Sequence, residues 1–124
     1  MKIAEASRLS GLSLDTIRFY ERAGLLPILE RGADGHRRFS TEVLRWLVLF
    51  ERLRSTGMPM REMKRYADLA AKGDATMEER LDMLERHLER IAATEARIRA
   101  CRELIERKIV EHGGKGRARP GEMS

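Results

Sequence analysis

The side chains with the clearest chemical potential are arginines and hydroxyl residues in two stretches near the N-terminus. Thr16, Arg18 and Tyr20 recur at alternate positions, and Arg37-Arg38 follow a glycine-containing segment. Guanidinium groups bind phosphate oxygens through paired hydrogen bonds, and hydroxyl groups donate to or accept from many polar partners. These residue types therefore favour recognition of a polyanion over the making or breaking of covalent bonds.

Catalytic and metal chemistry find little support in the sequence. It has no pair of carboxylates, no nucleophile with a matching base and no glycine-rich phosphate loop, so we predict that the protein is not an enzyme and needs no cofactor. Cys101 and His112 are the closest pair of soft metal ligands in the C-terminal part. Eleven residues along one helix separate them by about 16 Å, too far to hold one metal ion. We therefore predict no metal site.

Cys101 is the only cysteine, so no internal disulfide can form and a reducing compartment is the simpler expectation. Two interpretations of this thiol stay open. Its neighbours Arg97, Arg99 and Arg102 would favour the thiolate and make it a sensor of oxidants or electrophiles. The alternative is a small, half-buried residue that only fills space, which we weigh more heavily.

The charge is distributed unevenly along the 124 residues, whose net charge is +5. Residues 1–75 hold 14 Lys and Arg against 10 Asp and Glu, residues 76–112 hold 8 against 9, and residues 113–124 hold 3 against 1. Basicity thus accompanies the N-terminal stretches and the tail, which suits an anionic partner. Neither a signal peptide nor a run of about 18 apolar residues is present, so we expect a cytoplasmic protein without membrane contact.

Two short helices with a tight turn are predicted to position the first stretch. The first covers about residues 3–10, and Gly11 can end it in the left-handed conformation. Ser13 is a good N-cap for the second, at about residues 14–23. The pattern is that of a helix-turn-helix, with Tyr20 and Arg22 expected on the exposed flanks and Phe19 expected to face inward.

A small basic hairpin is predicted to position the second stretch. Ile28 and Leu29 suit a strand, residues 32–35 form a turn cluster, and residues 37–39 return as a second strand. A basic hairpin directly after the second helix is predicted to be a wing.

Further helices are predicted after the wing. Ser40 caps a third helix that Gly57-Met58-Pro59 ends, and a fourth covers about residues 60–71. In the third, we expect Trp46 to pack in a core or an interface and not to stack on a base.

Thr76 can cap a last helix that runs to about residue 112 without Gly or Pro, a length of about 55 Å. Its apolar residues recur as heptads, which predicts a coiled coil with a second copy of the chain. The expected dimerisation residues are Leu81, Leu84, Leu88, Ile91, Ile98 and Ile105. Glu95 and Arg102 interrupt the seam. Two arrangements stay open for these two residues. In an antiparallel pair of helices, Glu95 and Arg102 can meet across the two-fold axis. Alternatively, the helices separate at this point and both side chains stay solvated.

Several ordered motifs resemble the MerR family of bacterial transcription regulators. The matching residues are Ile3–Ala6, Gly11–Ser13, Thr16–Glu21, Gly24–Pro27 and Gly35–Ser40. His36 and Phe39 stand where the family commonly has tyrosine. The cysteine sets of the family's metal and iron–sulfur sensors are absent, and the chain has no room for an appended drug-binding domain.

The resemblance implies an all-α fold with a small β wing: a winged helix-turn-helix followed by a long antiparallel coiled-coil dimerisation helix. The expected domains are the DNA-binding domain (1–71), the dimerisation helix (76–112) and a disordered basic tail (113–124). The implied function is sequence-specific binding of double-stranded promoter DNA as a homodimer. Such dimers distort an over-long promoter spacer so that RNA polymerase can read both promoter elements.

The residues expected to contact DNA fall into two groups. The first turns of the second helix should read base edges, and other side chains should hold the backbone. The first group is Leu14, Asp15, Thr16 and Arg18, and the second is Arg8, Tyr20, His36, Arg37 and Arg38. Arg18 can reach either a guanine or a phosphate, and the resemblance favours the phosphate. The alternative function is a helical protein-interaction module in which the basic hairpin is incidental.

Overall fold

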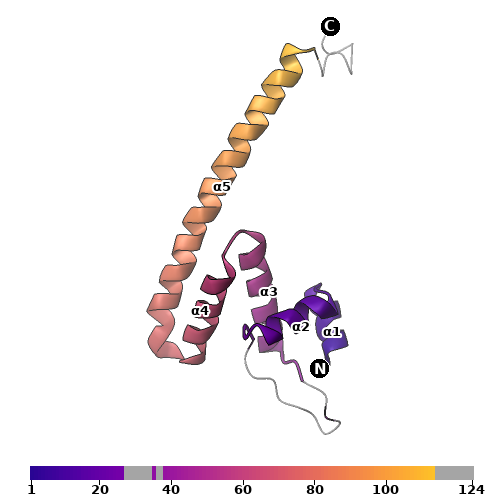
Figure 1. Ribbon diagram of the computed structural model, residues 1–124, viewed down its shortest axis with the longest axis vertical. Helices are drawn as coiled ribbons and strands as arrows, with labels where there is room; N and C mark the ends of the chain where they lie inside the picture. Colours follow the sequence, from indigo (N-terminus) through magenta and orange to yellow (C-terminus); the bar gives the residue numbers. More distant parts are fainter. Residues whose placement is uncertain (27–34, 36–37, 114–124) are drawn as a thin grey trace. The chain divides into compact units, whose positions relative to one another are not determined.

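The structure, a computed structural model, describes residues 1–26, 35 and 38–113 (Figure 1). The helices are α1 (Ile3–Ser10), α2 (Leu14–Arg22), α3 (Thr41–Ser55), α4 (Met60–Ala71) and α5 (Met77–Glu111), with a short 3₁₀ turn, η1 (Asp74–Thr76), before α5. The described residues contain no strand, so the fold there is all-α. The predicted wing hairpin falls mainly on residues 27–34 and 36–37, which lie outside the described residues, as does the predicted tail beyond residue 113.

The chain divides into two units, Met1–His87 and Leu88–Ser124. The first unit reaches past the predicted limit at residue 71 and includes the first turns of α5. This division falls inside a single helix, so it marks no boundary between two separate domains. The domain limits predicted from the sequence therefore stay predictions.

The core of the first unit is built from one face of each helix. In α3, residues 43, 47, 50 and 53 follow the helical period and are all buried. The aromatic rings cluster there: Trp46 lies 5.2 Å from Phe50 and 5.9 Å from Tyr66, measured between ring centroids. The expected packing role of Trp46 is thus confirmed. The buried apolar residues are Ala6, Ile17, Tyr20, Leu25, Phe39, Val43, Leu47, Phe50, Leu53, Met58, Met63, Tyr66, Leu69 and Met83.

Phe39 ties the segment before α3 to the N-terminus. Its ring is buried, its N–H donates to the Met1 carbonyl at 2.6 Å, and its own carbonyl accepts from the Met1 amino group at 2.9 Å. Ser40 then caps α3 by accepting from the Val43 N–H at 3.1 Å, as predicted. The position that the family commonly fills with tyrosine is therefore an apolar anchor in this chain.

The connection between α4 and α5 uses Thr76 differently from the prediction. Its hydroxyl donates to the Leu69 carbonyl at 2.6 Å and accepts from Arg80 Nε at 3.0 Å. Arg65 and Glu79 form an ion pair across the same connection. Thr76 therefore fastens the end of α4 and does not act as the expected simple N-cap, because η1 leads directly into α5.

Candidate nucleic-acid interface

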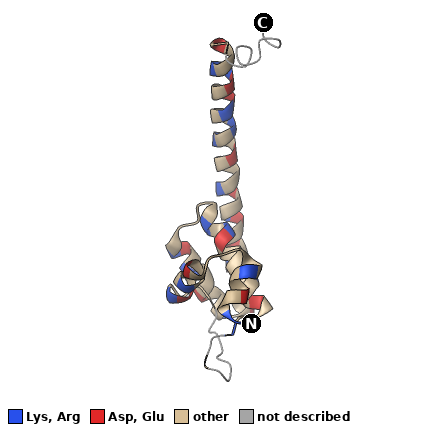
Figure 2. Cartoon of the chain, turned by 90° about the vertical axis from the view of Figure 1, so that its right-hand side faces the viewer, with Lys and Arg blue, Asp and Glu red and all other residues tan. Residues whose placement is uncertain are grey.

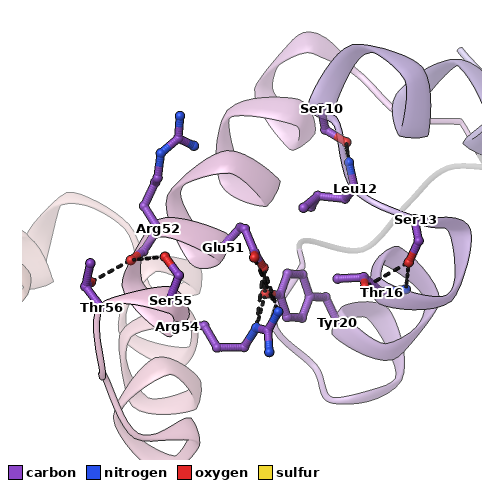
Figure 3. A network of polar contacts seen from close by, with 10 residues as sticks. All are labelled: Ser10, Leu12, Ser13, Thr16, Tyr20, Glu51, Arg52, Arg54, Ser55 and Thr56. Carbon is purple, nitrogen blue, oxygen red and sulfur yellow. Dashed lines mark hydrogen bonds and ion pairs between the residues drawn. The ribbon is translucent and has the colours of Figure 1, made fainter. Parts of the chain in front are cut away.

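The turn between α1 and α2 is set by glycine and serine side chains. Gly11 has φ +79° and donates its N–H to the Ser7 carbonyl, which ends α1 as predicted. The Leu12 N–H donates to Ser10 Oγ at 3.2 Å. Ser13 then caps α2, because its Oγ accepts from the Thr16 N–H at 3.0 Å and donates to Thr16 Oγ1 at 2.9 Å (Figure 3). The local sequence thus fixes where α2 begins.

One side of α2 is open to solvent. Asp15 and Arg18 lie one turn apart on it, with 3.9 Å between their charged atoms, and both side chains are at least half exposed. Leu14 and Phe19 expose 36% and 42% of their surface, and Arg22 is also exposed. Thr16 is half-buried at the edge of this side. The exposed face of α2, Leu14, Asp15, Arg18, Phe19 and Arg22, is therefore both charged and apolar.

The sequence-based orientation of the two aromatic residues of α2 is wrong. Tyr20 was expected on the exposed flank and is fully buried, whereas Phe19 was expected to face inward and is exposed. The helical period explains this, since Tyr20 follows the buried Ile17 by three residues and Phe19 follows it by two. That spacing was the signal in the sequence that could have placed Phe19 on the exposed face.

Two side chains of α3 provide hydrogen-bond partners for the buried hydroxyl of Tyr20. Its hydroxyl donates to Glu51 Oε1 at 2.6 Å and accepts from Arg54 Nε at 2.9 Å (Figure 3). Burial, followed by the hydrogen bond to Glu51, raises the pKa of Tyr20 to about 12. The hydrogen bond from Tyr20 is in turn the main cause that lowers the pKa of the Glu51 carboxyl. At neutral pH the tyrosine is thus a neutral donor and the carboxylate a charged acceptor.

The structure describes only some of the other residues that were expected to contact the DNA backbone. Arg8 is exposed and pairs with Glu5 at 3.5 Å. Arg38 is exposed, while His36 and Arg37 lie outside the described residues. The structure adds a cation that the sequence did not suggest, because Lys2 joins Arg18 and Arg22 around a hollow of about 520 Å³ that also includes Glu21.

The apolar residues of the predicted coiled coil fall into two groups. Leu84 is half-buried and packs against the core, and Ile91 is also half-buried. Leu81, Leu88, Ile98 and Ile105 expose between 51% and 64% of their surface. Both signs of charge alternate along α5 (Figure 2), and the predicted Asp82–Arg86 pair is present at 3.4 Å. In a single copy of the chain, α5 therefore carries an uncovered apolar stripe.

The described part of the chain also bears on metal binding, thiol chemistry and membrane contact. It holds no group of His, Cys, Asp or Glu that could bind a metal ion. Cys101 is a free, exposed thiol. None of the described helices combines the length and the apolar character that crossing a membrane requires.

Known proteins resemble the chain in sequence. A family model described as MerR HTH family regulatory protein matches residues 1–69. The chain is 38% identical over 106 residues to an uncharacterized HTH-type transcriptional regulator of Haemophilus influenzae, which covers 86% of this chain and 78% of that protein. It is 32% identical over 91 residues to the HTH-type transcriptional regulator AdhR of Bacillus subtilis, which covers 73% and 65%, respectively.

Solved structures resemble the chain over most of its length. The crystal structure of HiNmlR, a MerR family regulator lacking the sensor domain and bound to promoter DNA, matches with a TM-score of 0.83 and 36% identity over 94% of this chain and 92% of that one. A MerR family transcriptional regulator from Bacillus thuringiensis matches with a TM-score of 0.81 and 28% identity, over 90% and 97% of the two chains.

These relatives are named as regulators and not as enzymes. The family model spans more than half of the chain, and the structural likeness extends through the long helix as well as the helix-turn-helix. The chain therefore belongs to the MerR family of helix-turn-helix, DNA-binding transcriptional regulators.

Proposed function

We propose that this regulator binds promoter DNA in a sequence-specific manner as a homodimer and distorts the promoter spacer for RNA polymerase. The observation that carries the proposal is the exposed face of α2, which presents two guanidinium groups, a carboxylate and two apolar side chains on one well-capped helix. The likeness to a family member bound to promoter DNA supports it. The exposed face of α2 has the dimensions and mixed chemistry that a major groove accepts.

Base reading is assigned to the first turns of α2. Arg18 can form paired hydrogen bonds to guanine, Asp15 can accept from cytosine, and Leu14 can contact a thymine methyl group. Thr16 Oγ1 accepts from Ser13, so its own hydrogen is directed to no acceptor among the described residues and can be donated to a base. We add Phe19 to this group because its ring is exposed beside Arg18.

Backbone contacts are assigned to basic residues around this helix. Arg8, His36, Arg37 and Arg38 keep their expected role, and the hollow lined by Lys2, Arg18 and Arg22 adds a concave basic surface next to α2. Each cation that replaces a counterion on the duplex contributes to the salt dependence of binding. Tyr20 is left out because its hydroxyl is occupied by Glu51 and Arg54.

Dimer formation is assigned to the apolar stripe of α5. Leu88, Ile98 and Ile105 are each more than half exposed in one chain, and a second helix is the simplest cover for residues at heptad spacing. Two copies in antiparallel orientation would place two α2 helices on a palindromic site. Deforming the spacer costs a few kcal/mol, which the additional phosphate contacts of the dimer offset.

The test separates base reading from backbone binding. The preferred duplex is first selected from random sequence, and each variant is then titrated with that duplex and a scrambled one across a salt series. Thr16→Ala should cost about 1–3 kcal/mol on the selected duplex and little on the scrambled one. Arg37→Ala and Arg38→Ala should weaken both duplexes alike and lower the salt slope by about one unit.

A matched control is Arg86→Ala, which removes an exposed arginine from the outer side of α5. It should change neither affinity nor salt slope. Equal losses on both duplexes for Thr16→Ala, together with a selective loss for Arg38→Ala, would reverse the assignment of helix and wing.

A protein-interaction module remains the alternative, favoured by the same exposed stripe on α5. In that case the apolar residues would receive a different protein and the basic surface would be incidental. The wild-type chain would then pass through a duplex DNA column at moderate salt without retention. Retention that is reversed by added salt would support the DNA-binding assignment.

A further inference from the structure

The hydroxyl of Tyr20 is the one polar link that joins the middle of α2 to α3 in the network of Figure 3. Glu51 and Arg54 also pair with each other, at 3.1 Å between Oε1 and Nη2, within a single turn of α3. That pair is local to one helix and can form without α2. What Tyr20 adds is therefore a directional connection between the helix of the proposed DNA face and the helix beneath it.

Directionality distinguishes this contact from the apolar contacts of α2. Ile17 is buried next to Tyr20 and contributes area to the core, but methyl groups tolerate small rotations. The Tyr20 hydroxyl must instead satisfy one acceptor at 2.6 Å and one donor at 2.9 Å at once. Hydrogen bonds weaken steeply when distance or angle departs from these values, so the pair resists rotation of α2 about its axis.

The required accuracy is high because base readout is geometric. Side chains of an α-helix extend about 5–6 Å from its axis, so a rotation of roughly 10° moves their tips by about 1 Å. A shift of that size spoils a hydrogen bond to a base edge. A phosphate contact by a long basic side chain tolerates it more easily, since its energy is mainly that of a screened charge.

We propose that Tyr20, held between Glu51 and Arg54, is a positioning residue that sets the rotation of α2 and thereby how strongly the regulator discriminates between DNA sequences. The inference rests on the proposed function, because it assigns base reading to α2. It gives Tyr20 a different task from the backbone contact expected from the sequence. Loss of the hydroxyl should lower specificity and leave non-specific affinity nearly unchanged.

The test uses Tyr20→Phe, which keeps the buried ring and removes only the link to α3. The matched control is Tyr66→Phe, which deletes the hydroxyl of another buried tyrosine in the same core. Affinities for the selected and the scrambled duplex are measured for the full-length chain. We expect the ratio of the two affinities to fall about tenfold for Tyr20→Phe, equal to about 1.4 kcal/mol, and to stay constant for Tyr66→Phe.

A conservative variant separates positioning from mere stability. Glu51→Gln retains an oxygen that can accept from Tyr20, so it should keep most of the discrimination, whereas Glu51→Ala should lose it. A wild-type ratio in Tyr20→Phe would overturn the proposal. If Tyr20→Phe does not fold, Glu51→Ala decides, and an unchanged ratio in that variant would overturn the proposal equally. A wild-type chain that binds both duplexes alike would contradict the proposed function itself, and this inference with it.

Discussion

The two units use their apolar residues in opposite ways. Before Leu88, large apolar side chains such as Phe50 and Leu47 are fully buried within the same chain. From Leu88 onward, Leu88, Ile98 and Ile105 expose 64%, 63% and 58% of their surface. Both units are helical and rich in charge, so secondary structure does not cause the difference. The first unit has a core of its own, whereas the apolar side chains of the second unit that are named above lie uncovered in the single chain.

The change from buried to exposed apolar side chains occurs within α5. Met83 is the last apolar residue of α5 that is counted in the core, and His87 is the last buried residue of α5 in the described part of the chain. His87 Nε2 lies 2.7 Å from Thr56 Oγ1, which in turn donates to the Arg52 carbonyl at 2.6 Å. The first turns of α5 are thus part of the first unit, although the predicted heptads already include Leu81 and Leu84 there.

The largest expected effect concerns the core of the first unit. Phe50→Ala should lower the free energy of unfolding by about 3–5 kcal/mol, because it leaves a cavity beneath Trp46 and Tyr66. Met60→Ala is the control, because Met60 is exposed on α4 and its truncation should lower the free energy of unfolding much less. The measurement is denaturant unfolding at fixed protein concentration. A loss below about 1 kcal/mol for Phe50→Ala would show that this unit is not supported by its own core.

The next effect concerns association through the second unit. Ile91→Asp places a charge in the apolar stripe of α5 and should yield monomers in light scattering, with weaker DNA binding because the second half-site is lost. The helix-turn-helix should stay folded, since Ile91 lies beyond His87. Ala93→Asp adds the same charge on the outer side of the heptad and should remain dimeric. A dimeric Ile91→Asp variant would place the seam elsewhere.

A smaller effect is expected from acid. The folded-state pKa of Glu51 is lowered, mainly by the Tyr20 hydrogen bond, so its contribution to stability is present above the usual carboxyl pKa. It is lost as pH falls through the lowered value. Unfolding of the wild type and of Glu51→Gln, compared between neutral and acid pH, should show a weaker dependence on acid in the variant.

The control for this comparison lies in the second unit. Glu106 pairs with Arg102 at 3.2 Å while both side chains remain more than half exposed. Surface pairs of this kind contribute little, so Glu106→Gln should leave the acid profile unchanged. Parallel pH profiles for Glu51→Gln and the wild type would argue against the network as a source of stability.

The features that were predicted correctly depend on residues close together in the sequence. The ends of α1 and α2 follow from Gly11 and Ser13, whose roles are decided within a few residues of the chain. The orientation of Tyr20 was predicted wrongly although its spacing from Ile17 indicated burial, whereas its partner Glu51, 31 residues away, could not be predicted from near neighbours. Lys2 was overlooked because only the fold brings it beside Arg18 and Arg22. The heptad pattern alone also does not reveal which of its residues the same chain covers, as it does Leu84.

The smallest expected effect tests whether the second unit does more than associate. Cys101 is exposed in the single chain, so the predicted half-buried state requires a second copy of the helix. Serine differs from cysteine by one atom and keeps a small polar group, so Cys101→Ser should preserve both dimerisation and DNA binding.

If the thiol only fills space, a promoter reporter should respond identically in both forms under aldehyde, peroxide and disulfide stress. If the thiolate is a sensor, oxidation or alkylation must change the association of the helices, and the response would disappear in Cys101→Ser while basal output stayed the same. A response that persists in Cys101→Ser would show that this thiol is not the sensor, and the sequence contains no other cysteine that could take its place.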